Sequence, residues 1–277
     1  MKRRLNSSKY IYGIEYIFNV LWLIRIPIVS VSILLLINAF VLSGVQNVFF
    51  PCISTMCMLF FGYVINDILD VKIDIISAPD RPIPSGKISL RVAKWIGGFF
   101  GGLALIFALL SENILFVLYI VTYAVMFWIY TKHLKRNWLI KNGVTALFFS
   151  SLALIPVIFE KSALAAILPL FAVSFVFTLG REILMDIKDS AGDNVIPGNI
   201  RIKVELGWVV STVLIVAAFL LMEIMCFETY VLRYIVITVV CASFTLVLRN
   251  KKKKIWLCAE IIKLWFLINL FFLLVKM

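Results

Sequence analysis

The chain has 277 residues, of which 63% are hydrophobic, and a mean hydropathy of +1.05. Soluble domains are about half apolar, so this composition excludes a soluble globular protein and indicates an integral membrane protein. The net charge of +12 does not indicate nucleic acid binding, because the basic residues lie in connections between apolar runs, where membrane topology accounts for them. His133 is the only histidine, which excludes a zinc site with several histidine ligands from one chain.

Nine apolar runs divide the chain, and runs of roughly 17 to 25 residues are long enough to cross a bilayer as helices. They comprise residues 26–44, 48–65, 92–110, 114–130, 143–159, 163–180, 207–226, 230–248 and 255–275. We therefore expect an all-α membrane protein in which nine transmembrane helices surround a central cavity and cytoplasmic loops cap it. The whole chain, residues 1–277, is expected to form one domain.

Basic residues are concentrated in every second connection, starting with the N-terminal segment. The only basic residues in the opposite connections are Lys161 and Arg233. The positive-inside rule therefore places the N-terminus and the long loops in the cytoplasm. The lysine- and isoleucine-rich composition suggests an AT-rich genome, which is consistent with a prokaryotic plasma membrane.

Two aspartate triplets with identical spacing lie at the cytoplasmic ends of the second and sixth runs. They are Asp67, Asp70 and Asp74, and Asp186, Asp189 and Asp193. The i, i+3, i+7 spacing predicts that each triplet lies on one face of a helix. Acidic residues after a span can be a solvated loop, but the matched spacing on one side of the membrane argues for function. Mg²⁺ is bound by a few carboxylates together with substrate phosphates, so we predict a metal-bound diphosphate.

The four-run interval between the triplets suggests a pseudo-repeat with halves of about residues 1–140 and 141–277. Each half would contribute one acidic helix end and one long cytoplasmic loop. The third run also contains two overlapping GxxxG spacings, formed by Gly97, Gly98, Gly101 and Gly102. These spacings suit either dimerisation or close packing of helices within the chain, and we favour packing.

Several motifs resemble those of the UbiA superfamily of intramembrane prenyltransferases. Residues 66–74 match its NDxxDxxxD pattern, and residues 181–193 are similar to its second acidic motif. The segments 81–86 and 130–136 also look like family signatures. The resemblance covers essentially the whole chain, and the paired acidic motifs are its most specific part.

The resemblance implies Mg²⁺-dependent ionisation of an isoprenyl diphosphate. The implied Mg²⁺ ligands are Asn66, Asp67, Asp70, Asp74, Asp186, Asp189 and Asp193, among which Asp67, Asp70, Asp186 and Asp189 would be catalytic. Basic residues would bind the diphosphate, namely Lys132, Arg136, Lys188, Arg81, Arg181 and Arg25. Aromatic rings would face the carbocation and the prenyl tail, namely Tyr63, Tyr123, Phe127 and Tyr130. Arg25 can equally extend to the membrane surface, and the aromatic residues can equally anchor helix ends.

The sequence motifs constrain the identity of the prenyl acceptor less than that of the isoprenyl diphosphate donor. Residues 79–89 and the Arg181-Glu182 pair look most like the digeranylgeranylglyceryl phosphate synthases of the superfamily, which implies geranylgeranyl transfer to geranylgeranylglyceryl phosphate. Departures from the family pattern occur at Ile28 and Val29 and in residues 201–203. Two alternatives therefore stay open. One is prenylation of an aromatic or quinone-precursor acceptor, and the other is a terpene cyclase that needs no acceptor. The oligomeric state is not predicted.

Overall fold

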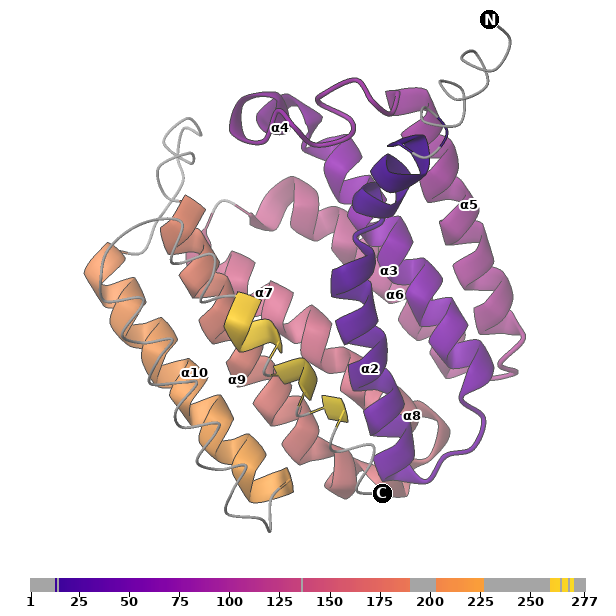
Figure 1. The fold of residues 1–277 in the computed structure, drawn as a ribbon. Helices are drawn as coiled ribbons and strands as arrows, with labels where there is room; N and C mark the ends of the chain where they lie inside the picture. The colour runs from indigo at the N-terminus through magenta and orange to yellow at the C-terminus, as the bar shows by residue number, and fades with distance from the viewer. Residues whose placement is uncertain are drawn as a thin grey trace, which may run out of the picture. The chain divides into compact units, whose positions relative to one another are not determined.

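The computed structural model describes residues 13, 15–135, 137–189, 203–226, 260–264, 266–268 and 270–271. Within these ranges, the side chains of residues 77, 188–189, 204 and 223–226 are not described. Every regular element of three or more residues in this part of the chain is helical (Figure 1). The prediction of an all-helical membrane protein is confirmed at this level.

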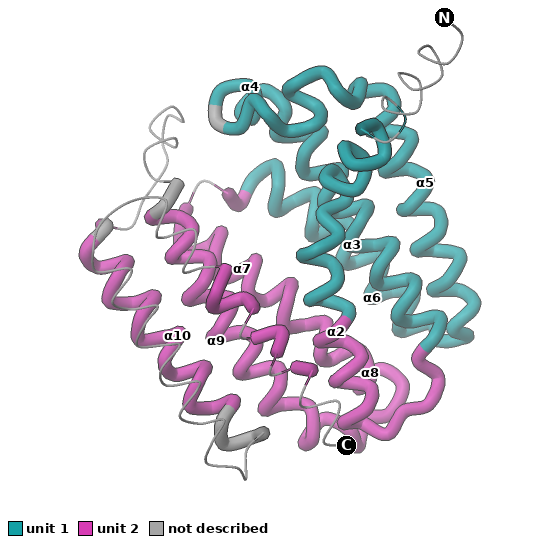
Figure 2. Tube along the Cα trace, in the orientation of Figure 1, with its two compact units in different colours: residues 1–33, 49–133 teal, residues 34–48, 134–277 magenta. Residues whose placement is uncertain are grey.

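The chain divides into two compact units, shown in Figure 2. Unit 1 comprises Met1–Ile33 and Phe49–His133, and unit 2 comprises Leu34–Val48 and Leu134–Met277. The helix α2 (Ile26–Ser43) contributes its first part to unit 1 and its remainder to unit 2. The predicted internal repeat is not tested by this division and stays a prediction.

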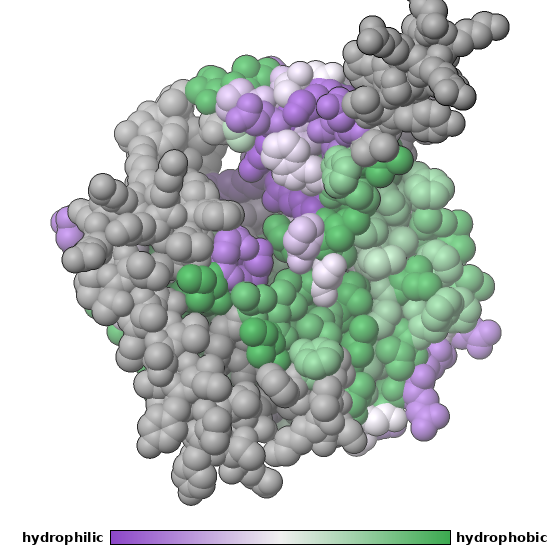
Figure 3. All heavy atoms as spheres, viewed as in Figure 1, coloured by the Kyte–Doolittle hydropathy of each residue, from purple (hydrophilic) through white to green (hydrophobic). Residues whose placement is uncertain are grey.

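Unit 1 is organised around α3 (Phe49–Leu69), which packs against α5 (Leu90–Leu109) and α6 (Ile114–Ile129). The short helix α4 (Val71–Ser77) follows α3 almost directly. Side-chain caps define two of the helix starts, since Ser89 accepts from Val92 N and Asn113 accepts from Leu115 N. Large apolar side chains remain exposed along α5 and α6, as expected where a helix faces lipid. In contrast, hydrophilic residues gather at the end of unit 1 that contains α4 (Figure 3).

Unit 2 is organised around α9 (Leu164–Asp189), which packs against α7 (Trp138–Ser151) and α10 (Val204–Cys226). A 3₁₀ turn (Leu152–Leu154) and the short helix α8 (Ile155–Phe159) continue α7. Pro156 lies in the first turn of α8, directly after the 3₁₀ turn, and in a continuous α-helix its ring would clash with the carbonyl of residue 152. A second 3₁₀ turn (Lys161–Ala163) leads into α9.

Seven helices in the described part of the chain are long and apolar enough to cross a membrane. They comprise Ile26–Ser43, Phe49–Leu69, Leu90–Leu109, Ile114–Leu134, Trp138–Phe159, Lys161–Ile187 and Glu205–Met222. They correspond to the first seven predicted runs, with ends that differ by up to seven residues. The predicted run 230–248 lies outside the described residues, and the run 255–275 is described only in short helical pieces. Nine transmembrane helices therefore remain a prediction.

Candidate active site

The first acidic motif lies where α3 ends and α4 begins. Asp67 is in the last turn of α3, Asp70 is the residue between the helices, and Asp74 is in α4. The expected single regular helix is therefore interrupted at Asp70, whose φ and ψ are −86° and −2°. The hydrogen-bond ladder nevertheless continues, because Asp70 N donates to Asn66 O and Asp74 N donates to Asp70 O, each at 2.9 Å. Asp67 and Asp74 are both buried.

The loop after α4 positions Arg81. Its prolines exclude a regular helix, and the loop forms its own hydrogen bonds instead. Arg81 N donates to Ala78 O at 3.1 Å, Ser85 N donates to Arg81 O at 3.0 Å, and Ile88 N donates to Pro82 O at 2.9 Å. The side chain of Ile88 is only 1% exposed and anchors the loop in the unit. The Arg81 backbone is thus fixed on both sides.

Arg25 lies at a break between helical residues 15–23 and α2. Pro27 is in the first turn of α2, where a missing N–H is tolerated, but its ring would clash with the carbonyl of residue 23 in a continuous helix. The chain turns at Arg25 instead, with a φ of +53°. For a residue with a Cβ, this left-handed conformation costs about 1–2 kcal/mol. The break directs the side chain away from the helix path and toward α3.

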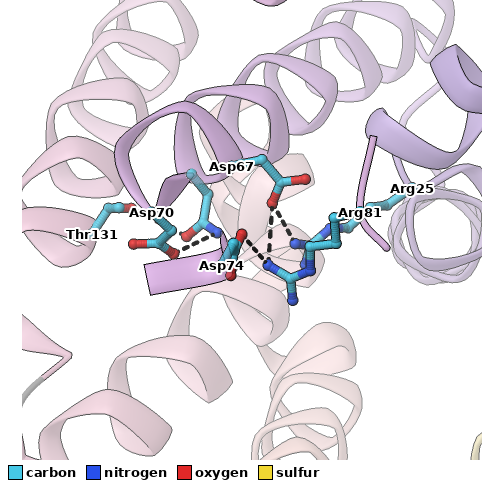
Figure 4. A network of polar contacts seen from close by, with 7 residues as sticks. Arg25, Asp67, Asp70, Asp74, Arg81 and Thr131 are labelled. Carbon is cyan, nitrogen blue, oxygen red and sulfur yellow. Dashed lines mark hydrogen bonds and ion pairs between the residues drawn. The ribbon is translucent and has the colours of Figure 1, made fainter. Parts of the chain in front are cut away.

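The two guanidinium groups meet at the first acidic motif (Figure 4). Arg25 Nη2 lies 2.6 Å from Asp67 Oδ1, and the Arg25 side chain also stacks 5.1 Å from the centroid of the Tyr63 ring. Arg81 Nη1 lies 2.6 Å from Asp74 Oδ2 and 3.8 Å from Asp67 Oδ1. Arg81 therefore bridges the two buried carboxylates. Arg25 and Arg81, both predicted to bind the diphosphate, thus each contact a predicted metal ligand.

Asp70 points in a different direction from Asp67 and Asp74 (Figure 4). One of its oxygens, Oδ2, accepts a hydrogen bond from Asn66 Nδ2 at 3.1 Å. The hydroxyl oxygen of Thr131 lies 3.4 Å from Asn66 Oδ1 and 2.9 Å from Phe127 O. Thr131 belongs to a π-helical turn (Tyr130–Leu134), a rare element that often marks functional sites. Thr131 lies in the signature segment 130–136, but the sequence motif alone assigns it no role.

Burial raises the pKa of the Asp74 carboxyl above its ordinary value. The Arg81 guanidinium lowers this pKa, whereas the nearby Asp70 and Asp67 charges raise it further. Burial is the largest of these effects. A cation that joins the motif would favour the ionised form of Asp74 and lower its pKa.

Aromatic side chains occupy the turns of α3 and α6 below the acidic motif. Tyr63 precedes Asp67 by one helical turn, and its ring lies edge-on to Phe127 with centroids 6.3 Å apart. On α6, Tyr119, Tyr123 and Phe127 repeat every four residues and contact one another in succession, with centroids 5.7 Å apart in both pairs. Three of the four predicted prenyl-binding residues are therefore in one cluster. Tyr130 begins the π-helical turn above it.

The second acidic motif is described at Asp186, near the end of α9. Lys141 Nζ forms an ion pair with Asp186 Oδ1, and Asn142 Nδ2 donates to Asp186 Oδ2 at 2.8 Å. Both partners lie in the first two turns of α7, and neither belongs to the motifs recognised in the sequence. Lys141 is near the N-terminus of α7, where its charge opposes the helix dipole, but the apolar run 143–159 begins after it, so hydropathy carries no sign of this role.

The remaining predicted basic ligands have other surroundings. Lys132 is exposed, with its Nζ 4.7 Å from the centroid of the Trp128 ring. Arg181 Nη1 forms a 2.6 Å ion pair with Glu182 Oε1. Among the described side chains, neither cation forms an ion pair with an aspartate of the two triplets. The side chains of Lys188 and Asp189, and all of Arg136 and Asp193, lie outside what the structure describes.

The donor set agrees with Mg²⁺ held jointly with a substrate. Among the described residues, no group of three or more histidine, cysteine or carboxylate side chains could hold a metal ion alone. Asn66, Asp67, Asp70 and Asp74 nevertheless supply only oxygen donors at one helix end, and oxygen is the donor that Mg²⁺ prefers. Because Mg²⁺ usually keeps water or phosphate ligands, one or two of these carboxylates suffice as protein ligands.

Curated relatives resemble parts of the chain. Digeranylgeranylglyceryl phosphate synthase from Sulfurisphaera tokodaii is 31% identical over 165 residues, which cover 56% of this chain and 57% of the relative. The enzyme of the same name from Methanoculleus marisnigri is 37% identical over 135 residues, covering 48% of this chain and 47% of the relative. The one from Saccharolobus solfataricus is 32% identical over 191 residues, covering 64% of each chain. The matches thus span about half to two thirds of these relatives.

Solved structures match over nearly the whole length. A structure of digeranylgeranylglyceryl phosphate synthase has a TM-score of 0.64 at 26% identity, covering 94% of this chain and 98% of that one. An apo UbiA homologue from Aeropyrum pernix K1 has the same fold, with a TM-score of 0.63 at 15% identity over 90% of this chain and 97% of that one. The model of the UbiA prenyltransferase family matches residues 26–270. The chain therefore belongs to the UbiA prenyltransferase family.

Proposed function

We propose that this protein transfers an isoprenyl group from an isoprenyl diphosphate to a lipophilic acceptor in a Mg²⁺-dependent reaction. The observation that carries the proposal is the first acidic motif, where buried Asp67 and Asp74 share Arg81 and where Arg25 joins Asp67. Such a pairing of carboxylates with guanidinium groups suits a substrate that brings both metal and phosphate. Bound Mg²⁺ would supply charge stabilisation to the leaving diphosphate.

The chain's own residues would perform three tasks. Asn66, Asp67, Asp70 and Asp74 would hold the metal in the first half of the chain, with Asp186, Asp189 and Asp193 as its counterpart in the second. Arg25 and Arg81 would neutralise the diphosphate as the allylic C–O bond breaks. The cluster of Tyr63, Tyr123 and Phe127 would face the allylic cation and exclude water from it.

Geranylgeranylglyceryl phosphate is the acceptor that the relatives support. The three archaeal relatives named above are digeranylgeranylglyceryl phosphate synthases, as is the solved structure at 26% identity. Their name implies a geranylgeranyl donor and a phosphorylated glycerol lipid as acceptor. We therefore assign the same pair of substrates to this chain.

The test is a turnover assay on purified protein in lipid vesicles. Radiolabelled geranyl, farnesyl and geranylgeranyl diphosphates are each incubated with geranylgeranylglyceryl phosphate, with an aromatic acceptor or without any acceptor, and each incubation is run with and without Mg²⁺. Diphosphate should be released only when Mg²⁺, geranylgeranyl diphosphate and the glycerol phosphate acceptor are all present. Release without any acceptor would indicate a cyclase instead, and release only with the aromatic acceptor would correct the substrate. No release from any donor would contradict prenyl transfer altogether.

A further inference from the structure

Both carboxylate oxygens of Asp186 have nitrogen partners from α7. Lys141 pairs with Oδ1, and Asn142 donates to Oδ2. A metal ion that binds Asp186 would therefore compete with Lys141, because a divalent cation and an ammonium group on the same carboxylate repel each other. Because Asp186 is the first aspartate of the second acidic motif, this contact bears directly on how that motif would load its metal.

Lys141 is the partner that is able to move. Its side chain is 28% exposed, and lysine carries its charge on a flexible four-carbon stem. Asn142 is completely buried, and its short side chain is fixed by the bond to Asp186. The Asn142 Oδ1 atom is buried and has no hydrogen-bond partner among the described residues. It is therefore an oxygen atom next to the carboxylate that could ligate a metal ion.

If the Lys141 ammonium leaves Asp186, it requires another negatively charged partner. It lies four residues after Asn137, the residue that caps α7, so its ammonium is close to the positive end of the helix dipole. Without a negative partner, the ammonium and the helix end would repel each other. If Asp186 turns to a metal ion, the anion that arrives with that metal is the diphosphate of the proposed substrate.

We propose that Lys141 competes with Mg²⁺ for Asp186 and transfers to the diphosphate when the metal binds. The ammonium would thereby keep Asp186 compensated before substrate arrives and then act as an additional diphosphate ligand. The second motif would consequently bind metal weakly by itself and more tightly together with diphosphate. This inference rests on the proposed function, because it takes diphosphate as the ligand that receives Lys141.

The experiment measures binding on full-length protein in lipid nanodiscs, separately from turnover. Mn²⁺, which replaces Mg²⁺ in such sites, is titrated without diphosphate and followed by the EPR signal of the free ion. Inorganic diphosphate is then titrated calorimetrically at a fixed Mg²⁺ concentration. The variants are Lys141→Met, which removes the charge and shortens the unbranched side chain by one atom, and Lys141→Arg, which keeps the charge. Asp186→Asn identifies the Mn²⁺ ion that depends on Asp186.

The matched control is Lys161→Met. Lys161 is exposed and precedes α9, whereas Asp186 is near the other end of this helix, about 33 Å away at 1.5 Å per residue. Lys141→Met should bind the Asp186-dependent Mn²⁺ about tenfold more tightly and diphosphate about tenfold more weakly than wild type, as expected when one charge-assisted bond is lost. Lys141→Arg and Lys161→Met should stay within about twofold of wild type. If Lys141→Met does not fold, Lys141→Gln replaces it.

Unchanged Mn²⁺ affinity in Lys141→Met would overturn the competition, and unchanged diphosphate affinity would overturn the transfer. In either case, wild-type turnover with isoprenyl diphosphate would leave the proposed function intact. If wild-type protein binds neither Mn²⁺ nor diphosphate, the proposed function fails and this inference fails with it.

Discussion

At the scale of single residues, Asp67 is the carboxylate on which the first motif depends most. It is 3% exposed, and both guanidinium groups approach the same oxygen, Oδ1. A charge buried to this degree is stable only with its partners, and the loss of one partner typically costs about 3–5 kcal/mol. Asp67 is therefore essential to the charge balance of the motif as well as a candidate metal ligand.

The variant Asp67→Asn should lose prenyl transfer by at least about 100-fold, because the amide neither binds Mg²⁺ strongly nor compensates Arg25 and Arg81. The measurement is kcat/KM in the vesicle assay. Asp80→Asn is the control, since Asp80 is an exposed aspartate in the loop after α4. It should retain activity within about twofold, and equal losses in both variants would contradict a special role for Asp67.

The backbone of Arg25 allows its strain to be separated from its charge. Arg25→Ala and Arg25→Gly both remove the guanidinium, but only glycine adopts a φ of +53° without strain. We expect Arg25→Gly to be more stable than Arg25→Ala by about 1 kcal/mol, measured as the difference in thermal unfolding in the same detergent. The order should reverse for Lys94→Gly and Lys94→Ala, since Lys94 is exposed within α5 and helical alanine is favoured there.

At the scale of helices, the overlapping GxxxG spacings of α5 separate into two faces. A Cβ on Gly97 would lie 3.4 Å from Val64, and a Cβ on Gly101 would lie 3.0 Å from the Phe61 ring, both on α3. A Cβ on Gly98 or Gly102 would meet nothing within 4 Å. One glycine pair therefore permits close packing of α5 on α3, which is the interpretation favoured from the sequence. The other pair, Gly98 and Gly102, leaves room for a Cβ, with no neighbouring atom within 4 Å of it among the described residues.

The two faces predict opposite effects of alanine. Gly101→Ala should lower the thermal unfolding temperature by several degrees, because the Phe61 ring must shift. Gly98→Ala should leave it unchanged or raise it slightly, because helical alanine is favoured over glycine by up to about 1 kcal/mol. Thermal unfolding of the purified variants compares them directly. Destabilisation by Gly98→Ala would instead point to a contact on the open face.

Hydropathy predicts helices well but not what happens inside them. The apolar run 48–65 stops before the acidic motif, whereas the helix α3 continues to Leu69 and includes Asp67, as the spacing of the triplet indicates. The reason is that motif residues with charged side chains still form helical hydrogen bonds once Arg25 and Arg81 compensate them. The interruption at Asp70, the left-handed Arg25 and the π-helical turn at Thr131 depend on such tertiary contacts, so hydrophobic patterning could not reveal them.

In the candidate site, too, some residues can be recognised from the sequence and others only from tertiary contacts. Spacing marks Asp67, Asp70, Asp74 and Asp186 as candidates, because each is an acidic residue at the end of an apolar run, and their roles stay a prediction. Lys141 was not identified, since its position relative to the runs looks like an ordinary topological signal. Only the packing of α7 against α9 shows that its charge is used on Asp186.

At the scale of the whole molecule, the distribution of basic residues predicts the membrane orientation. Ser85 lies in an expected cytoplasmic loop and Ser162 in an expected external one, and both are exposed. In a background with the five native cysteines replaced, Ser162→Cys should react with a membrane-impermeant maleimide on intact cells. Ser85→Cys should react only after the cells are permeabilised. The reverse pattern would invert the predicted topology.

We expect the break at Arg25 to make the site sensitive to the thickness of the bilayer. Arg25 lies at the junction that begins α2, and a transmembrane helix changes its tilt when the hydrocarbon core becomes thicker or thinner. A change in tilt at this junction would alter the distance between the guanidinium and Asp67. We therefore expect prenyl transfer to depend on lipid chain length, with an optimum in vesicles of intermediate acyl chain length. In Arg25→Gly this dependence should flatten, so that the membrane itself would regulate the enzyme through one arginine.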